Sequence, residues 1–227
     1  MTRVSISLIL LIALTFLAIW LVLDERKHSQ AIVYQQRGNI LSELENYDEA
    51  LEYYRQAIKL RVSFGEAYNN LANALRHKGK LKEAISYYND AIRFKKDYAE
   101  AHGNLGLTLS ELGRSEEAIK EFRSSLKINP YLFRMHNDLA ILLAQQGDFS
   151  EAINHYQQAI SIYPGFAKGH NNLGSALAQQ SRFEESMVHF EKAINIDPDY
   201  TDAKKNLELS RSLSKKKINV KVSQEIR

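Results

Sequence analysis

The regular spacing of three histidines raises the question of metal binding. Three of the seven histidines, His102, His136 and His170, recur at one constant interval. Imidazole nitrogens bind zinc at about 2 Å, so a cluster of these side chains could hold a metal ion. Equivalent positions in stacked helical units lie about 10 Å apart, one helix-packing distance. The interval therefore favours packing between helices, and we expect neither a metal ion nor another cofactor.

Side-chain amides recur at the same interval. A primary amide offers a donor and an acceptor, which match the C=O and N–H of a peptide group. Asparagine is a mediocre helix former, so a periodic row of it needs a reason. The row could face solvent, bond the neighbouring repeat or bind a partner's backbone. The row consists of pairs of adjacent residues. Gln35–Gln36 comes first along the chain, and Asn69–Asn70, Gly103–Asn104, Asn137–Asp138 and Asn171–Asn172 follow at the same interval.

No catalytic motif accompanies these rows. The sequence has no glycine-rich phosphate loop, no His-Glu-x-x-His pair and no Gly-x-Ser-x-Gly elbow. The absence of cysteine excludes disulfides and thiolate chemistry, and a formal net charge of +3 is too small to indicate nucleic acid as a partner. We therefore expect a protein that binds another molecule and is not an enzyme.

The same interval extends through the central part of the chain. A fixed period of about 34 residues indicates one supersecondary unit that is repeated and stacked. Small residues recur where two helix backbones approach closely, because a large side chain would overpack the crossing. The two small rows are Ala50, Ala84, Ala118, Ala152, Ser186 and Ala57, Ala91, Ser125, Ala159, Ala193, and the aromatic row between them is Tyr54, Tyr88, Phe122, Tyr156, Phe190.

Each unit is expected to form two helices around a turn. In the second unit, residues 66–77 and 81–94 show apolar residues at three-four spacing, and Gly79 lies between them. One such pair cannot bury its apolar stripe alone, so each pair must cover the next. Five units fit without a gap, at residues 31–64, 65–98, 99–132, 133–166 and 167–200.

This pattern resembles the tetratricopeptide repeat family, whose unit is two antiparallel helices with small residues at their crossing and a proline near the end. Pro130, Pro164 and Pro198 fit that proline, whereas Val62 and Lys96 replace it earlier. The first unit also departs from the pattern. Arg37 stands where the later units have Leu71, Leu105, Leu139 and Leu173, and Glu45 stands where units two to four have Gly79, Gly113 and Gly147. The resemblance covers about three quarters of the chain and implies an all-α, right-handed α-solenoid that binds proteins.

The segments AYNNLANALRHKGKLKEAISYYNDAI and HNNLGSALAQQ look like the superhelical repeats of O-linked N-acetylglucosamine transferase. In that family, a ladder of asparagines lines the concave surface and grips the backbone of an extended peptide. Carried over by position, the ladder here is Asn70, Asn104 and Asn172, with Gln36 and Asp138 in the interrupted rungs. The catalytic domain of the transferase has no counterpart in this chain.

Selectivity is then expected from neighbouring positions on the same helix face, which become more apolar along the chain. The basic cluster with which related domains clamp a carboxylate is incomplete, because only Arg76, Arg134 and Lys168 lie nearby. We therefore do not expect a carboxylate clamp. The predicted peptide-binding residues are Gln36, Asn70, Asn73, Arg76, Asn104, Leu107, Asp138, Ile141 and Asn172.

The amino-terminal segment contains 20 uncharged, mostly apolar residues, 4–23. A helix of this length is about 30 Å long, which matches the hydrocarbon core of a bilayer. We therefore predict a transmembrane helix, followed by a linker over residues 24–30; a cleaved signal peptide is the alternative. The orientation of this helix in the membrane is scarcely determined, because positive charges flank both ends: Arg3 before it, and Arg26 and Lys27 after it. We slightly prefer an orientation that places the repeats on the extracytoplasmic side.

The carboxy-terminal segment is expected to close the stack. Residues 201–215 predict a capping helix with Ala203 and Leu207 inward, Leu209 as a further inward candidate, and lysines and acids outward. Residues 216–227 predict a basic, mobile tail. This tail is either simply solvated or attracted to anionic lipid or an acidic partner.

Together these features predict five repeats and a capping helix behind one transmembrane helix. The expected function is a membrane-tethered scaffold or assembly factor of a membrane complex, which binds a protein or extended peptide in a concave groove. The alternative is an accessory subunit that presents acceptor protein to a membrane glycosyltransferase.

Overall fold

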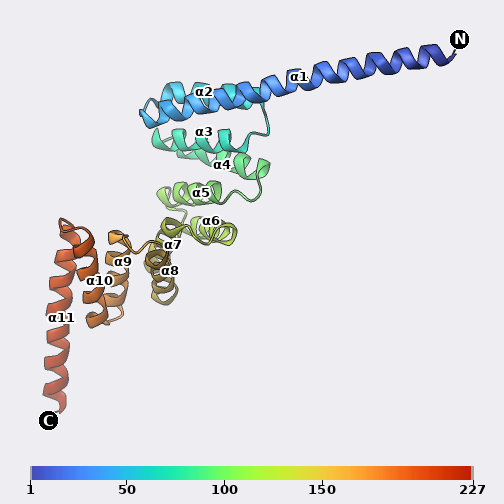
Figure 1. The fold of residues 1–227 in the computed structure, drawn as a ribbon. Coiled ribbons are helices and arrows are strands. Elements are labelled where there is room, and N and C mark those ends of the chain that lie inside the picture. Colours follow the sequence, from blue (N-terminus) through green and yellow to red (C-terminus); the bar gives the residue numbers. More distant parts are fainter. Residues whose placement is uncertain (1, 226–227) are drawn as a thin grey trace. The chain divides into compact units, whose positions relative to one another are not determined.

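The structure is a computed structural model that describes the backbone of residues 2–225 and the side chains of residues 11–217. All the regular elements of this described part are α-helices (Figure 1). The all-α helical-repeat class predicted from the sequence is therefore confirmed. The helices are α1 Thr2–Glu43, α2 Tyr47–Leu60, α3 Gly65–His77, α4 Leu81–Phe94, α5 Ala99–Glu111, α6 Ser115–Ile128, α7 Phe133–Gln145, α8 Phe149–Ile162, α9 Ala167–Gln179, α10 Phe183–Ile196 and α11 Thr201–Glu225.

The chain forms two compact units, Met1–Thr108 and Leu109–Arg227. In the first unit, α1 packs on α2, α2 on α3, and α3 on α4. In the second unit, α6 through α11 pack successively in the same way. The repeat boundaries assigned from the sequence remain predictions.

The turn inside each repeat has the same backbone form in all five copies. Gly79, Gly113 and Gly147 have φ values of 73°, 74° and 87°, the left-handed region that glycine adopts without strain. Glu45 and Ser181 replace glycine and still adopt φ of 59° and 56°. In every repeat the next amide then bonds a leucine carbonyl five residues back, as in Lys80 N to Leu75 O at 2.9 Å. The departure at Glu45 therefore leaves the turn intact.

The small rows and the aromatic row are buried as predicted. Ala84 and Ala91 are fully buried, as are their counterparts in the other repeats. The aromatic side chain presses on the facing helix: a Cβ atom built at Gly38 would lie 2.5 Å from the Tyr54 ring, and one at Gly174 would lie 2.7 Å from Phe190. These contacts fix the crossing of the two helices in each repeat.

Helix α11 covers the last repeat. Ala203 and Leu207 are buried, and the Ser210 hydroxyl lies 3.1 Å from that of Ser186. Leu209 is 58% exposed, so its expected inward orientation is wrong. Helix α11 continues to Glu225, beyond the predicted end of the cap at residue 215. The mobile-tail prediction over residues 216–227 falls partly outside the described residues, since 226–227 are not described.

The amino-terminal prediction is corrected by the structure. Among the described residues, no helix combines the length and apolar character that crossing a membrane requires. The predicted transmembrane helix at residues 4–23, and with it the single-pass membrane localisation, is therefore wrong for this part of the chain.

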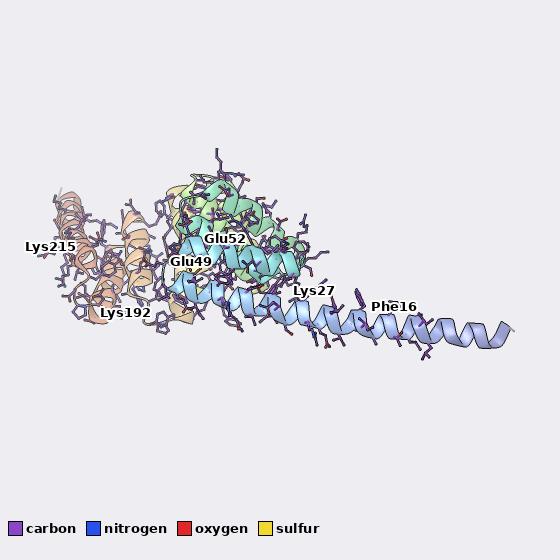
Figure 2. The ribbon with its side chains drawn as sticks, turned by 90° about the horizontal axis from the view of Figure 1, so that it is seen from above. Phe16, Lys27, Glu49, Glu52, Lys192 and Lys215 are labelled. Carbon is purple, nitrogen blue, oxygen red and sulfur yellow. The ribbon has the colours of Figure 1, made fainter. Side chains whose placement is uncertain are left out.

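This segment is instead the first part of α1, which runs without interruption into the first repeat as far as Glu43. Residues 11–30 are exposed, and Figure 2 shows Phe16 and Lys27 on the part of α1 that extends away from α2. The linker predicted over residues 24–30 is likewise helical.

The buried helix crossing generates a stability prediction. Ala84→Glu places a longer, charged side chain where the native side chain has no exposed surface, so unfolding free energy should fall by about 3 kcal/mol or more. Lys82→Glu, at an exposed position of the same helix, is the control and should change stability by less than about 0.5 kcal/mol. Urea melts compare the two, and equal losses would contradict the assigned faces.

Candidate functional site

A groove in the first unit opens on the first-helix face of the repeats. Its volume is about 320 Å³, and it includes the predicted residues Asn70 and Asn73. Side-chain hydrogen bonds cross its floor: Tyr54 Oη donates to Asn39 Oδ1 at 3.0 Å and lies 3.1 Å from Ser42 Oγ. The lining residues are Asn39, Ser42, Glu43, Tyr47, Tyr54, Asn70, Asn73, Ala74 and His77.

A groove in the second unit occupies equivalent repeat positions. Its volume is about 440 Å³, and it includes the predicted residues Ile141 and Asn172. Its walls are more apolar, because Ile141 and Ala144 replace Asn39 and Ser42 of the first unit. The lining residues are Ile141, Ala144, Gln145, Phe149, Tyr156, Lys168, Asn172, Ser175, Ala176 and Gln179.

The structure does not bring all predicted site residues to these grooves. Within the part of the chain that is described, neither groove is lined by Gln36, Arg76, Asn104, Leu107 or Asp138. The sequence alone missed Tyr47, Tyr54 and Tyr156, which come from the second helices. Their signal was available, since Tyr54 and Tyr156 lie in the aromatic row at the helix crossing.

The asparagines form hydrogen bonds between neighbouring repeats. The second amide of one pair donates to the first amide of the preceding pair: Asn104 Nδ2 to Asn69 Oδ1 at 3.1 Å, and Asn172 Nδ2 to Asn137 Oδ1 at 2.9 Å. The acceptors Asn69 and Asn137 are buried. Bonding of neighbouring repeats, one of the three roles open from the sequence, is therefore observed.

Helix α11 continues this arrangement at the end of the stack. Asn206 Nδ2 donates to Asn171 Oδ1 at 3.0 Å. Asn206 follows Asn172 by one repeat interval, so its role could have been predicted from the sequence. Between the first and second repeats the register differs, because Asn70 Nδ2 donates to Asn39 Oδ1 at 2.8 Å and Asn70 accepts from Asn69 at 3.2 Å.

Asp138 brings a carboxylate into this amide row. Its Oδ1 accepts from Asn137 Nδ2 at 3.0 Å. Burial raises the pKa of the Asp138 carboxyl, although that hydrogen bond and the charges of Lys168 and Arg134 oppose the shift. The row therefore presents acceptors of two kinds, neutral amide oxygens and one partly buried carboxylate.

Histidines pair across the two helices of the fourth and fifth repeats. The Nδ1 atoms of His136 and His155 lie 2.9 Å apart, and those of His170 and His189 lie 3.2 Å apart. The periodic spacing identified the first histidine of each pair and not the second. A signal existed, because the two second members are also separated by one repeat interval and equivalent positions earlier hold tyrosine pairs.

The hydrogen bonds define the protonation of these pairs. His136 Nε2 lies 3.0 Å from the Pro130 carbonyl, which can only accept, so Nε2 carries the proton and Nδ1 is left as an acceptor. When both rings are neutral, His155 Nδ1 is then the donor. The same argument applies to His170, whose Nε2 lies 3.2 Å from Pro164 O.

Burial lowers the pKa of all four imidazoles, and it lowers that of His189 to about 4, where His170 and Lys192 add to the effect and Glu185 opposes it. Among the described residues, no three histidine, aspartate or glutamate side chains are grouped so that they could hold a metal ion.

The family is shown by comparison with known proteins. A tetratricopeptide repeat model matches residues 36–98 and 137–201, and a second one matches residues 97–165. The chain belongs to the tetratricopeptide repeat family. The repeats of this family bind protein or peptide partners, which agrees with the expectation of a binding protein that is not an enzyme. No curated protein matches the chain.

Three solved structures with the same fold illustrate the similarity. YrrB, described as a tetratricopeptide repeat protein with an unusual peptide-binding site, is 26% identical with a TM-score of 0.64, covering 79% of this chain and 92% of YrrB. MamA is 21% identical with a TM-score of 0.65, covering 74% of this chain and 92% of MamA. The Cut9–Hcn1 hetero-tetramer of the APC/C is 21% identical with a TM-score of 0.67, covering 80% of this chain and 36% of that chain.

The histidine pairs generate a prediction of acid sensitivity. A histidine whose folded pKa lies below its ordinary value of 6.5 contributes stability above pH 6.5, and that stability is lost as the pH falls toward the folded pKa. Lowering the pH from about 7.5 to about 5 should therefore reduce the unfolding free energy of the second unit, by about 2 kcal/mol from His189 alone. Urea melts at both pH values measure this loss.

A matched variant comes from the chain itself. The double change His170→Tyr and His189→Tyr copies the Tyr68–Tyr87 pair of the second repeat, whose rings also pack together. It should reduce the loss of stability between the two pH values. A native protein equally stable at both pH values would show that the imidazoles are not held neutral by the fold.

Proposed function

We propose that this protein is a scaffold or assembly factor that binds extended segments of partner proteins on the first-helix faces of its repeats. The observation that carries the proposal is the recurrence of a groove at equivalent positions in both units. Asn70 and Asn73 line one groove, and Ile141 and Asn172 line the other. These four residues were predicted from the sequence to bind a peptide in a concave groove.

The amides at these grooves suit a peptide backbone. A primary amide has two N–H groups and an oxygen with two lone pairs, and the bond from Asn172 to Asn137 uses one N–H. Asn172 therefore keeps hydrogen-bonding capacity beyond its contact with the preceding repeat. Such contacts recognise the peptide backbone, and the differing groove walls supply the selectivity for side chains.

Two similarities of this chain to known repeat proteins support the proposal. YrrB, which carries a peptide-binding site by its description, is similar over most of its length. The resemblance of the repeats to those of O-linked N-acetylglucosamine transferase implies the same mode of backbone binding. No observation on the described residues favours the alternative of an accessory subunit of a membrane glycosyltransferase, and the proposal includes no attachment to a membrane.

The proposal predicts the effect of removing the ladder amides. Linear peptides selected from a random displayed library provide the ligand, and fluorescence anisotropy measures its affinity. The triple variant Asn70→Ala, Asn104→Ala, Asn172→Ala should weaken binding at least tenfold, because each lost hydrogen bond is worth about 0.5–1.5 kcal/mol. Its melting temperature should also fall, since the three amides donate to neighbouring asparagines at 2.8–3.1 Å.

A matched control separates binding from general effects of asparagine removal. Asn89, Asn154 and Asn195 are exposed on the second helices, so their replacement by alanine should leave affinity and melting unchanged. Affinity is measured well below the melting temperature of each variant. If no library peptide binds the native chain, or if the triple variant retains native affinity, the proposed function is wrong.

A further inference from the structure

One position of the repeat carries a tyrosine hydroxyl in three of the five copies. In the first two repeats this hydroxyl is bonded within the chain, because an asparagine lies opposite on the first helix. Tyr54 Oη donates to Asn39 Oδ1 at 3.0 Å, and Tyr88 Oη donates to Asn73 Oδ1 at 2.6 Å. The donor and its acceptor occupy the same two repeat positions in both cases.

The fourth repeat keeps the tyrosine and loses the acceptor. Ile141 occupies the repeat position of Asn39 and Asn73, and an isoleucine side chain cannot accept a hydrogen bond. Tyr156 is only 4% exposed, and its hydroxyl has no hydrogen-bond partner among the residues that the structure describes. Tyr156 lines the groove of the second unit, so the uncompensated donor belongs to the wall of that groove.

Packing does not require this hydroxyl. The same position holds Phe122 in the third repeat and Phe190 in the fifth, and both are buried to the same degree as the tyrosines. The Tyr156 hydroxyl is not among the enclosed side-chain atoms that lack a partner, so it is accessible from the groove and free to bond a ligand there. The tyrosine at position 156 is therefore best explained by an acceptor that is supplied from outside the chain.

The surroundings of Tyr156 restrict the chemistry of that acceptor. Ile141, Ala144, Phe149 and Ala176 give the groove apolar walls. Burial, together with the nearby Asp138 charge, raises the pKa of Tyr156, so the hydroxyl stays protonated and donates at neutral pH. Lys168 also lines the groove and offsets the Asp138 charge, so the groove does not select for an anion, and the neutral carbonyl of a peptide backbone is an acceptor that fits its apolar walls.

We infer that Tyr156 donates a hydrogen bond to a backbone carbonyl of the bound peptide, and that an apolar side chain of that peptide fills the groove beside it. This inference rests on the proposed function and assigns the partner's chemistry at the second unit: an extended segment with an exposed aliphatic or aromatic residue. The groove of the first unit differs, because its tyrosine hydroxyl already has an acceptor in Asn39.

The test uses the full chain and the library-selected linear peptides. Tyr156→Phe should weaken binding about three- to tenfold, which is the usual effect of one hydrogen bond, and should leave the melting temperature unchanged or higher. Tyr88→Phe is the matched control. It removes the bond to Asn73, so it should lower the melting temperature and leave the affinity unchanged.

A second variant supplies the missing acceptor. Ile141→Asn gives the fourth repeat the tyrosine–asparagine pair of the first two repeats, and it also makes the groove wall polar. It should weaken binding at least as much as Tyr156→Phe without lowering the melting temperature. The selected peptides should share an apolar residue, and replacing that residue by serine should reduce affinity for the native chain.

The outcomes separate the inference from the function on which it rests. If no peptide binds the native chain, the proposed function fails. If peptides bind and Tyr156→Phe retains native affinity, the inference alone is overturned. A melting temperature that falls in Tyr156→Phe as it does in Tyr88→Phe would also overturn it, because the hydroxyl would then be bonded within the chain.

Discussion

The close approach of two helix backbones in each repeat is the constraint on which the rest of the structure depends. Ala84 and Ala152 are fully buried because nothing larger fits between the helices. The aromatic ring beside each crossing presses on the first helix, as Tyr54 does at Gly38 and Phe190 at Gly174. Since the crossing is fixed, the remaining face of each first helix is presented in the same way in every repeat.

That face stabilises the stack, and in the proposed function the same side chains also bind the partner. Asn69 and Asn137 are buried and accept hydrogen bonds from the next repeat, so the amide row joins neighbouring repeats. A primary amide has more donors and acceptors than one such bond uses. A row that aligns neighbouring repeats can therefore also offer hydrogen bonds to a peptide backbone.

Single substitutions at equivalent positions give the two units different properties. The tyrosine–asparagine pair satisfies its own hydrogen bond in the first unit, whereas Ile141 leaves Tyr156 without an acceptor in the second. Likewise, the ring pairs of the first unit are tyrosines, such as Tyr68–Tyr87, whereas those of the second are histidines, such as His136–His155, which gain a proton in acid. A repeat fold tolerates these substitutions because the helix crossing already determines the backbone at each substituted position.

The sequence by itself determined the helix pairs, the buried small and aromatic rows, and the family, because the constant repeat interval shows each of these signals five times. It also selected Asn70, Asn73, Ile141 and Asn172 as residues of the groove face. The spacing could not predict which amide donates a hydrogen bond to which neighbour, nor that the histidines of the first and second helices contact each other. Those contacts depend on the direction in which side chains point between helices. The transmembrane prediction for residues 4–23 was wrong for the described residues, among which no helix could span a membrane, and the segment belongs to one helix that continues into the first repeat. Only the tertiary structure decided these points, since it alone places side chains from different helices at measured distances.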